Sequence, residues 1–270
     1  MKKIILPILI LTFLLSACQK ENVEYNMLVD EIIACESNLD GFLEKTNSSI
    51  NAEENAYNLL VSSYENQSEL YDEVDILNAK LIALQGIIKD DVYASVQEDI
   101  SALDTQIAQC TSEADKYYTE NVCTRVEAML DEYAAAPGPA SEIESYNELI
   151  NEIAFLEGTT AEQNTILQGQ MQILSAFEAC SNSYTQWIAA SETFGANSLL
   201  SESKETSRAL VHTYLDETNV YYETHLTGLN SVSSLDTSFH KNAEKFTQLF
   251  SGYSAIYEKA IGNLEEALTH

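Results

Sequence analysis

The chain has 270 residues and a formal net charge of −30, from 43 Asp and Glu against 13 Lys and Arg, and 45% of its residues are hydrophobic. That much apolar side chain excludes a disordered chain, and the excess of acid excludes a nucleic-acid-binding protein, which needs a basic footprint. Pro occurs 3 times and Gly 9 times, and their scarcity favours an all-α fold of long helices.

The first 17 residues have the organisation of a secretion signal. Lys2 and Lys3 form a charged start, and an almost unbroken apolar run follows at residues 4–15. This run is too short to be a stable anchor across a bilayer. Two small residues and a cysteine come next, in Leu15-Ser16-Ala17-Cys18. We therefore expect residues 1–17 to be removed as a signal peptide.

This tetrad resembles the lipobox of bacterial lipoproteins. The resemblance covers only residues 1–18. It implies that Cys18 is acylated on its sulfur and, after cleavage, on its amine, so that the acyl chains attach the protein to a membrane. Gln19 follows instead of Asp, which resembles outer-membrane sorting. The alternative is a free or disulfide-bonded Cys18.

The mature chain is predicted to begin with a short tether at residues 18–22, followed by a first bundle of three helices at residues 23–133. The first helix covers about 23–45, and the polar residues 47–49 are expected to break it. The second covers about 50–88 and carries a heptad seam, which the third repeats from Val92 onward. The seam positions are Leu70, Val74, Leu77, Leu81, Leu84 and Ile88, then Val96, Ile100, Leu103, Ile107, Cys110, Ala114 and Tyr117.

The apolar series changes phase after Tyr117, which predicts a stutter or bend near residues 119–121. Residues 134–140 read Ala-Ala-Ala-Pro-Gly-Pro-Ala and cannot continue a helix. We expect this segment to be a hinge before a second bundle of four helices at residues 141–270. Those helices are expected at about 141–157, 160–193, 198–226 and 235–268.

Four cysteines remain beyond Cys18: Cys35, Cys110, Cys123 and Cys180. An even number in an exported chain suggests disulfide bonds. With turns centred near residues 48 and 90, Cys35 would lie level with about residue 119, nearer to Cys123 than to Cys110. We expect a bond between Cys35 and Cys123. By elimination Cys110 would pair with Cys180, but register does not support that pair, and the alternative is that both are free.

Few residues point to catalysis or to metal binding. His212 and Asp216 lie four residues apart, which suits metal ligation on one helix face, but a surface pair is the favoured interpretation because no Glu-x-x-His occurs. Asp72-Glu73-Val74-Asp75 lacks the spacing of a calcium loop and indicates a solvated helix face. The 15 Tyr are interpreted as seam residues with hydroxyls in solvent, and the alternative is a recognition surface.

The sequence thus predicts an exported, lipid-anchored, elongated antiparallel helical bundle with coiled-coil-like seams, and not an enzyme. Its expected role is a binding or spacing module for a protein or surface-polymer partner at the cell envelope, with no cofactor, metal or nucleic acid. Loss of Lys2 and Lys3 with the signal leaves 11 basic and 43 acidic residues, a net charge of −32. Because this charge disfavours contact with anionic lipid head groups, acyl chains are the expected membrane attachment. One alternative is a solute- or metal-binding lipoprotein, or an enzyme, with a pocket in the bundle core; another is a surface-exposed adhesin or exclusion factor.

Overall fold

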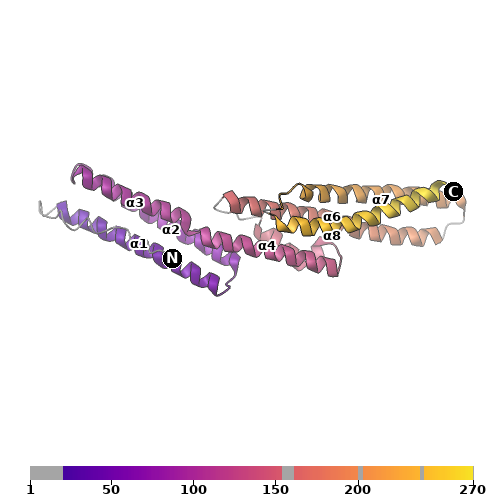
Figure 1. Cartoon of the computed structure of the whole chain (residues 1–270), viewed down its shortest axis with the longest axis horizontal. Coiled ribbons are helices and arrows are strands. Elements are labelled where there is room, and N and C mark those ends of the chain that lie inside the picture. Colours follow the sequence, from indigo (N-terminus) through magenta and orange to yellow (C-terminus); the bar gives the residue numbers. More distant parts are fainter. Residues whose placement is uncertain (1–20, 154–160, 200–202, 238–239, 270) are drawn as a thin grey trace. The chain divides into compact units, whose positions relative to one another are not determined.

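The structure, a computed structural model, describes residues 21–153, 161–199, 203–237 and 240–269. Over these residues it contains eight α-helices, one short 3-10 helix and no strand (Figure 1). This confirms the predicted all-α, bundled fold, with one helix more than the expected seven. The chain divides into two compact units, which we call unit 1, up to Ala114, and unit 2, from Asp115. The predicted signal peptide and Cys18 lie outside the described residues.

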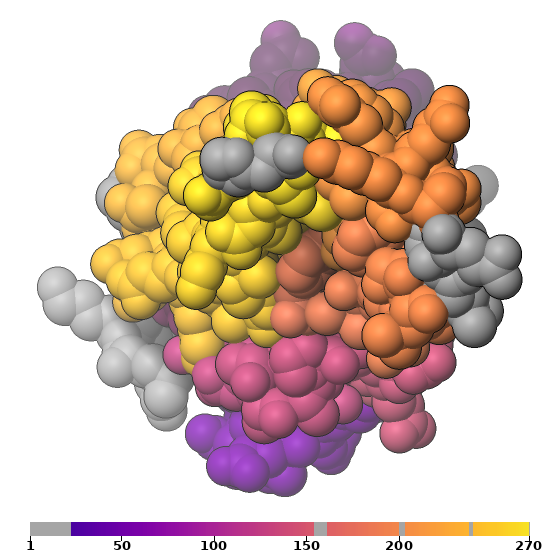
Figure 2. All heavy atoms as spheres, turned by 90° about the vertical axis from the view of Figure 1, so that its right-hand side faces the viewer, coloured from indigo at the N-terminus to yellow at the C-terminus, as the bar shows by residue number. Residues whose placement is uncertain are grey.

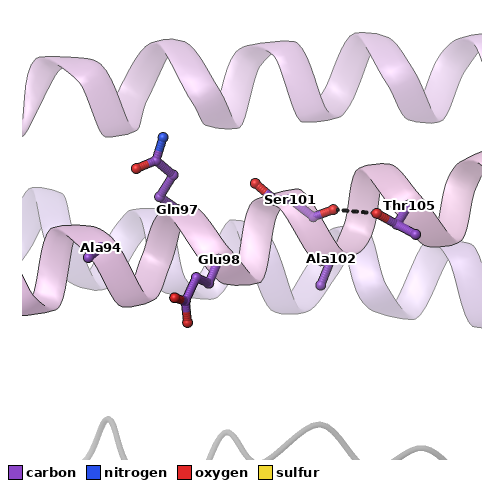
Figure 3. A pocket seen from close by; sticks show the side chains of 6 residues that line it. All are labelled: Ala94, Gln97, Glu98, Ser101, Ala102 and Thr105. Atoms are coloured by element: carbon purple, nitrogen blue, oxygen red, sulfur yellow. Dashed lines mark hydrogen bonds between the residues drawn. The ribbon is translucent and has the colours of Figure 1, made fainter.

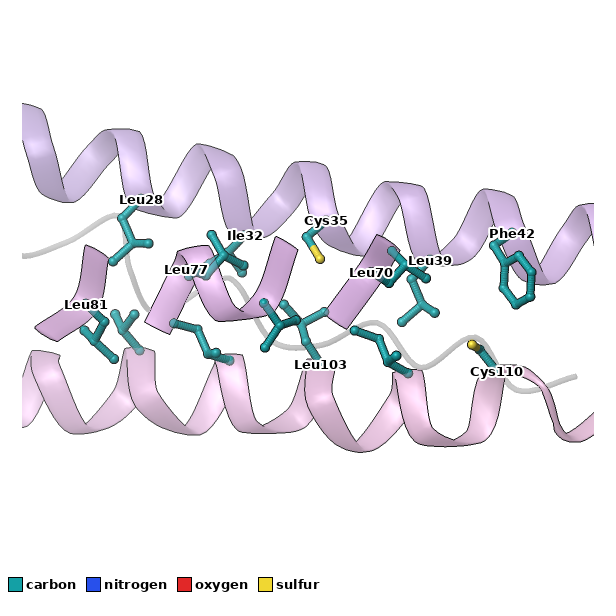
Figure 4. Close-up of a cluster of buried hydrophobic side chains, with 14 of the residues drawn as sticks. Leu28, Ile32, Cys35, Leu39, Phe42, Leu70, Leu77, Leu81, Leu103 and Cys110 are labelled. Carbon is teal, nitrogen blue, oxygen red and sulfur yellow. The ribbon is translucent and has the colours of Figure 1, made fainter. Parts of the chain in front are cut away.

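Unit 1 is a three-helix bundle of α1 (Glu21–Asn51), α2 (Ala56–Ala83) and α3 (Asp90–Cys110), which all pack on one another. Apolar residues at alternating steps of three and four line the inner face of each helix, as in a coiled coil. The predicted seam positions from Leu70 to Leu84 and from Val96 to Cys110 are all buried, and Ile88 packs beside them (Figure 4). Helix α1 contributes Leu28, Ile32, Cys35, Leu39 and Phe42 to the same core.

The helix that was expected to end near residue 45 instead continues to Asn51. Asn47 does not break it, because its side-chain Nδ2 donates a hydrogen bond to the carbonyl of Leu43 one turn earlier, at 2.8 Å. The chain turns where Glu53 adopts a positive φ of 54°. Asn55 then caps α2 by accepting a hydrogen bond from the backbone N–H of Asn58 at 2.9 Å. The turn therefore comes several residues later than predicted.

Of the stutter or bend predicted near residues 119–121, the bend is wrong, because those residues lie inside a continuous helix, α4 (Ser112–Ala135). The interruption falls earlier, at Thr111, between the end of α3 and the start of α4. Tyr118 is fully buried whereas Tyr117 is half-buried. The apolar series therefore changes phase before Tyr117 and not after it.

The expected division at residues 134–140 is also misplaced, because α4 shares its core with the helices that follow. The ring of Tyr133 packs edge-on against Phe177, with centroids 5.2 Å apart, and against Phe250 at 5.3 Å. Pro137-Gly138-Pro139 does follow the end of α4, but it forms a connection within unit 2. The boundary between the compact units lies at Ala114 and Asp115.

Unit 2 continues with a short 3-10 helix, η2 (Ala140–Glu142), and four α-helices. These are α5 (Glu144–Ile153), α6 (Ala161–Leu199), α7 (Lys204–Ser233) and α8 (Lys241–Thr269). Helix α6 packs on α5, α7 and α8, and α7 packs on α8. Figure 2 looks at one end of this unit and shows α8, in gold to yellow, against the orange end of α6 and start of α7.

Ion pairs join α4 to its neighbours in unit 2. The guanidinium of Arg125 contacts Glu148, at 3.1 Å, and Glu152, both on α5. Lys245 on α8 contacts Asp131 at 2.7 Å. All of these side chains are at least partly exposed to solvent, so each pair contributes about 0–1 kcal/mol. The shared aromatic core is therefore the main attachment of α4.

Candidate functional site

The predicted lipidation site, Cys18, lies outside the described residues, but helix α1 begins only three residues later. The expected tether of residues 18–22 is shortened, because Glu21 and Asn22 are already helical. An extended chain covers at most about 3.6 Å per residue, so the Cα atoms of Cys18 and Glu21 are at most about 11 Å apart. A membrane that held Cys18 would therefore hold the start of α1 close to its surface.

The predicted bond between Cys35 and Cys123 is absent from this structure, in which all four described cysteines are free thiols: Cys35, Cys110, Cys123 and Cys180. For Cys110 and Cys180 this agrees with the alternative that both are free. The register calculation failed because the first turn lies at residues 52–55, which puts Cys35 level with about residue 101 of α3. Figure 4 accordingly shows Cys35 at the level of Leu103. Cys110 lies about 14 Å further along the bundle, whereas bonded cysteines need Cα atoms within about 7 Å. The other two cysteines belong to unit 2.

These thiols are buried or half-buried and poorly reactive. Burial, with the carboxylate of Glu73 beside it, raises the pKa of Cys35 to about 11. Burial raises the pKa of Cys110 to about 11 and that of Cys180 to about 12. It likewise raises the pKa of Cys123 to about 11. Because the thiolate is the nucleophile and the metal ligand, protonated thiols of this kind indicate core residues.

The residues considered for metal binding lie on the surface. His212 and Asp216 are both exposed on α7. In the acidic segment of α2, Val74 is buried while Asp72 and Asp75 are exposed, as expected for a solvated helix face. In the part of the chain that the structure describes, no group of three or more His, Cys, Asp or Glu side chains is arranged to hold a metal ion.

A shallow depression runs along the outer face of α3 (Figure 3). Its lining residues are Ala94, Gln97, Glu98, Ser101, Ala102 and Thr105. All six come from one helix, and the hydroxyl of Thr105 is already bonded to the carbonyl of Ser101 at 3.0 Å. A specific small-molecule site needs polar groups that converge from several directions. This strip of small side chains does not supply them, so we assign no ligand to it.

A buried polar cluster joins three helices of unit 2. The side-chain Nδ2 of Asn242 on α8 donates hydrogen bonds to the carbonyl of Cys123 on α4, at 2.8 Å, and to Oε1 of Gln170 on α6, at 3.0 Å. Beside it, Gly169 leaves room for the ring of His240, since a Cβ on this glycine would come within 2.1 Å of the ring. Buried groups of this kind cost free energy when a partner is lost, so the cluster fixes how the three helices meet.

The sequence carried a signal for this cluster that pattern analysis overlooked. Gln170 lies three residues after Leu167 and four before Leu174, and Asn242 lies four residues before Phe246. Both amides therefore occupy positions with the spacing of the apolar core. A polar residue at such a position predicts a buried hydrogen bond between helices.

Two histidines of unit 2 are buried in neutral form. Nε2 of His225 is 2.9 Å from the carbonyl of Phe250, and because a carbonyl only accepts, this nitrogen carries the proton. Its Nδ1 is buried with no hydrogen-bond partner among the described residues. Burial lowers the pKa of His225, opposed by the bond to Phe250. Burial also lowers the pKa of His240, opposed by Asp236.

Several tyrosines pack along the cores with their rings half-buried, as their spacing predicted. Tyr71 packs against the core of unit 1. In unit 2, the rings of Tyr184 and Tyr253 lie 4.4 Å apart, and Tyr184 also packs 5.9 Å from Trp187. The expectation that the hydroxyls reach solvent is wrong for Tyr257 and Tyr133, which are fully buried; the hydroxyl of Tyr257 lies 3.3 Å from that of Ser183 in the core. These contacts account for the rings as core residues rather than as a recognition surface.

Four large apolar side chains are exposed at one end of unit 1, and we call them the apolar end. Val23 and Met27, on the first turns of α1, are 57% and 56% exposed. Ile82, on the last turn of α2, is 64% exposed, and Ile87, in the turn before α3, is 46% exposed. None of the described helices combines the length and the apolar composition that crossing a membrane requires.

Comparisons of this chain with protein-family models, with curated proteins and with solved structures find no match.

Proposed function

We propose that the protein is a lipid-anchored, extracytoplasmic helical module that binds a macromolecular partner, a protein or a surface polymer, and holds it at the cell envelope. The anchor in this proposal is Cys18, on the evidence of its position behind a signal sequence. The outer membrane is the preferred location because Gln19 follows the cysteine.

The observation that carries the proposal is the shape of each unit. Helix α6 has 39 residues and α1 has 31, which correspond to about 58 Å and 46 Å. Each unit packs such helices around a narrow core, so it presents long, continuous helical faces. A long face suits a macromolecule, whereas a small molecule needs a concave site with walls from several elements.

The chemistry of the side chains supports binding rather than catalysis. The thiols are held in the protonated form by burial, and His225 and His240 are buried in hydrogen-bonded or tightly packed positions. Groups that could act as nucleophile or base are thus used in packing. The charge of −32 favours partners with basic patches, with fast association that weakens as salt rises.

The lipid anchor is tested by metabolic labelling with an alkyne fatty acid. We expect label on the wild-type protein and none on Cys18→Ala, because the sulfur is the acyl acceptor. Label that persisted in Cys18→Ala would refute the assignment. Protease shaving of intact cells then separates a periplasmic module from a surface-exposed one.

The partner is tested by photo-cross-linking in living cells. A cross-linking amino acid replaces the exposed Val220 on α7 or Ile188 on α6, and the same replacements in a Cys18→Ala chain are the matched control. We expect a defined partner that is captured by the anchored protein only and that binds the purified protein less tightly at high salt. Absence of any capture, together with a small molecule or metal that stays with the protein through gel filtration, would favour the pocket-containing alternative.

A further inference from the structure

We propose that the apolar end of unit 1 rests against the phospholipid surface that holds Cys18, so that unit 1 contacts the bilayer directly as well as through acyl chains. This inference rests on the proposed lipid anchor and adds a second contact to it. It commits to one occupant for these exposed side chains, a bilayer of zwitterionic phospholipid.

The four side chains of the apolar end lie at the same end of unit 1 because α1 and α2 pack antiparallel. Leu28 and Leu81, the neighbours of Met27 and Ile82, lie at the same end of the core (Figure 4). The turn between α2 and α3 carries Ile87 to this end as well. Exposed apolar side chains from two helices and a turn thus face outward at the end where α1 begins.

The short connection to Cys18 brings this end to the membrane. Cys18 and Glu21 are at most about 11 Å apart along the chain, and Val23 follows in the first turn of α1. Apolar side chains at an interface insert about 5–10 Å into the boundary between head groups and acyl chains. The acyl chains therefore hold the apolar end within reach of that boundary.

The nearby charges specify the kind of lipid. Lys89 precedes two acidic residues, Asp90 and Asp91, at the start of α3, and Glu24 lies between Val23 and Met27. Lys80 is already paired with Glu31. Since this end has no surplus of basic side chains among its described residues, it does not attract anionic head groups. Contact with the bilayer therefore depends on the apolar side chains and suits zwitterionic lipid.

The test places an environment-sensitive NBD label on single introduced cysteines of the full, acylated protein in phosphatidylcholine vesicles. Val23→Cys and Ile82→Cys report on the apolar end. Ile33→Cys is a matched control at another exposed isoleucine of α1, about 15 Å further along the helix, and Asn51→Cys lies about 42 Å along it. Mock-labelled wild-type protein corrects for labelling of the native, poorly reactive thiols.

We expect labels at Val23 and Ile82 to show a blue shift and several-fold stronger quenching by spin-labelled lipid than the label at Asn51, with Ile33 between them. Equal quenching at Val23 and Asn51 would overturn the inference. A blue shift that appeared without vesicles and grew with protein concentration would also overturn it, by assigning the apolar end to a second copy of the chain. If fatty-acid labelling of Cys18 fails, the anchor itself is refuted; if it succeeds without quenching, only this inference is refuted.

Discussion

The contact between α6 and α7 depends on a glycine, and substitution of that residue tests the packing of unit 2. Gly228 on α7 faces α6 so closely that an added Cβ would lie 2.8 Å from Sγ of Cys180 and 3.2 Å from the carbonyl oxygen of Ala176. The sulfur can rotate away, but the carbonyl belongs to the helix backbone. Gly228→Ala should therefore push the two helices apart.

The expected loss follows from two opposing effects. Overpacking a well-packed core costs about 1–3 kcal/mol, and alanine in a helix is favoured over glycine by about 1 kcal/mol. We expect a net loss of up to about 2 kcal/mol in the free energy of unfolding of unit 2. Gly262→Ala on α8 is the matched control, because nothing lies within 4 Å of its added Cβ, and it should gain about 0.5–1 kcal/mol.

The assay uses the single tryptophan of the chain, Trp187, which is 8% exposed in the core of unit 2. Its fluorescence during urea or thermal denaturation reports on this unit alone. Gly228→Ala should melt about 1–12 °C below Gly262→Ala, given about 2–4 °C per kcal/mol for a unit of this size. Adding Cys180→Ala should recover part of the loss. Equal melting temperatures for the two glycine variants would refute the close approach of α6 and α7.

Three further predictions follow from the buried groups. Iodoacetamide at pH 7.5 should modify the four mature thiols much faster in urea than in the native protein, and a disulfide-linked peptide in a non-reducing map would contradict the free thiols. Burial lowers the pKa of His225 from 6.5, so at acidic pH the unfolded chain binds a proton that the native chain does not. The stability of wild type relative to His225→Gln should therefore decrease as the pH is lowered below 6.5, and a difference that stayed constant with pH would oppose this. Asn242→Ala should lower the free energy of unfolding by about 1–3 kcal/mol, because it removes the hydrogen bond to Gln170. The control Asn66→Ala loses only an exposed hydrogen bond within its own helix and should cost less than 0.5 kcal/mol. Equal losses would argue against the buried cluster.

The core of unit 1 could be predicted from sequence because it is a local property of each helix. Steps of three and four residues between Leu70 and Leu84, and between Val96 and Cys110, are sufficient to put these side chains on one helix face. All of them are buried in the structure. That prediction needs no knowledge of the partner helix, so the seam residues are correct even though the helix boundaries were misplaced.

The register between those helices could not be predicted with the same certainty, because it depends on where the turn lies. The positive φ of Glu53 and the cap from Asn55 place the first turn about five residues later than expected. When the turn between two antiparallel helices moves along the chain, the residue of the second helix that lies level with a given residue of the first moves by twice as many positions. That shift was enough to separate Cys35 from the position where a disulfide partner was sought.

The unit boundary was misplaced for a related reason. Pro137-Gly138-Pro139 is a strong local signal that a helix ends, and α4 does end just before it. A compact unit, however, is defined by which residues share a core, and the contacts of Tyr133 with Phe177 and Phe250 join residues far apart in sequence. The boundary between Ala114 and Asp115 lies in the first turn of α4, close to the interruption at Thr111, and neither proline nor glycine marks it in the sequence.

Both units combine an apolar core with polar contacts between helices, but the most closely fitted contacts lie in unit 2. In unit 1 the core cluster is aliphatic apart from two buried thiols and Phe42, and the heptad pattern is supplemented by hydrogen bonds between helices, from Gln67 to the carbonyl of Ile107 at 3.0 Å and from Asn38 to Glu73 at 3.2 Å. In unit 2 the hydrogen bonds of Asn242 and the close approach at Gly228 favour one alignment of the helices, because any sliding would break the first or produce a clash at the second. A face that recognises a macromolecule must keep its side chains in fixed positions, so the partner of the proposed function is best sought first on the exposed faces of unit 2, with the cross-linking positions Val220 and Ile188.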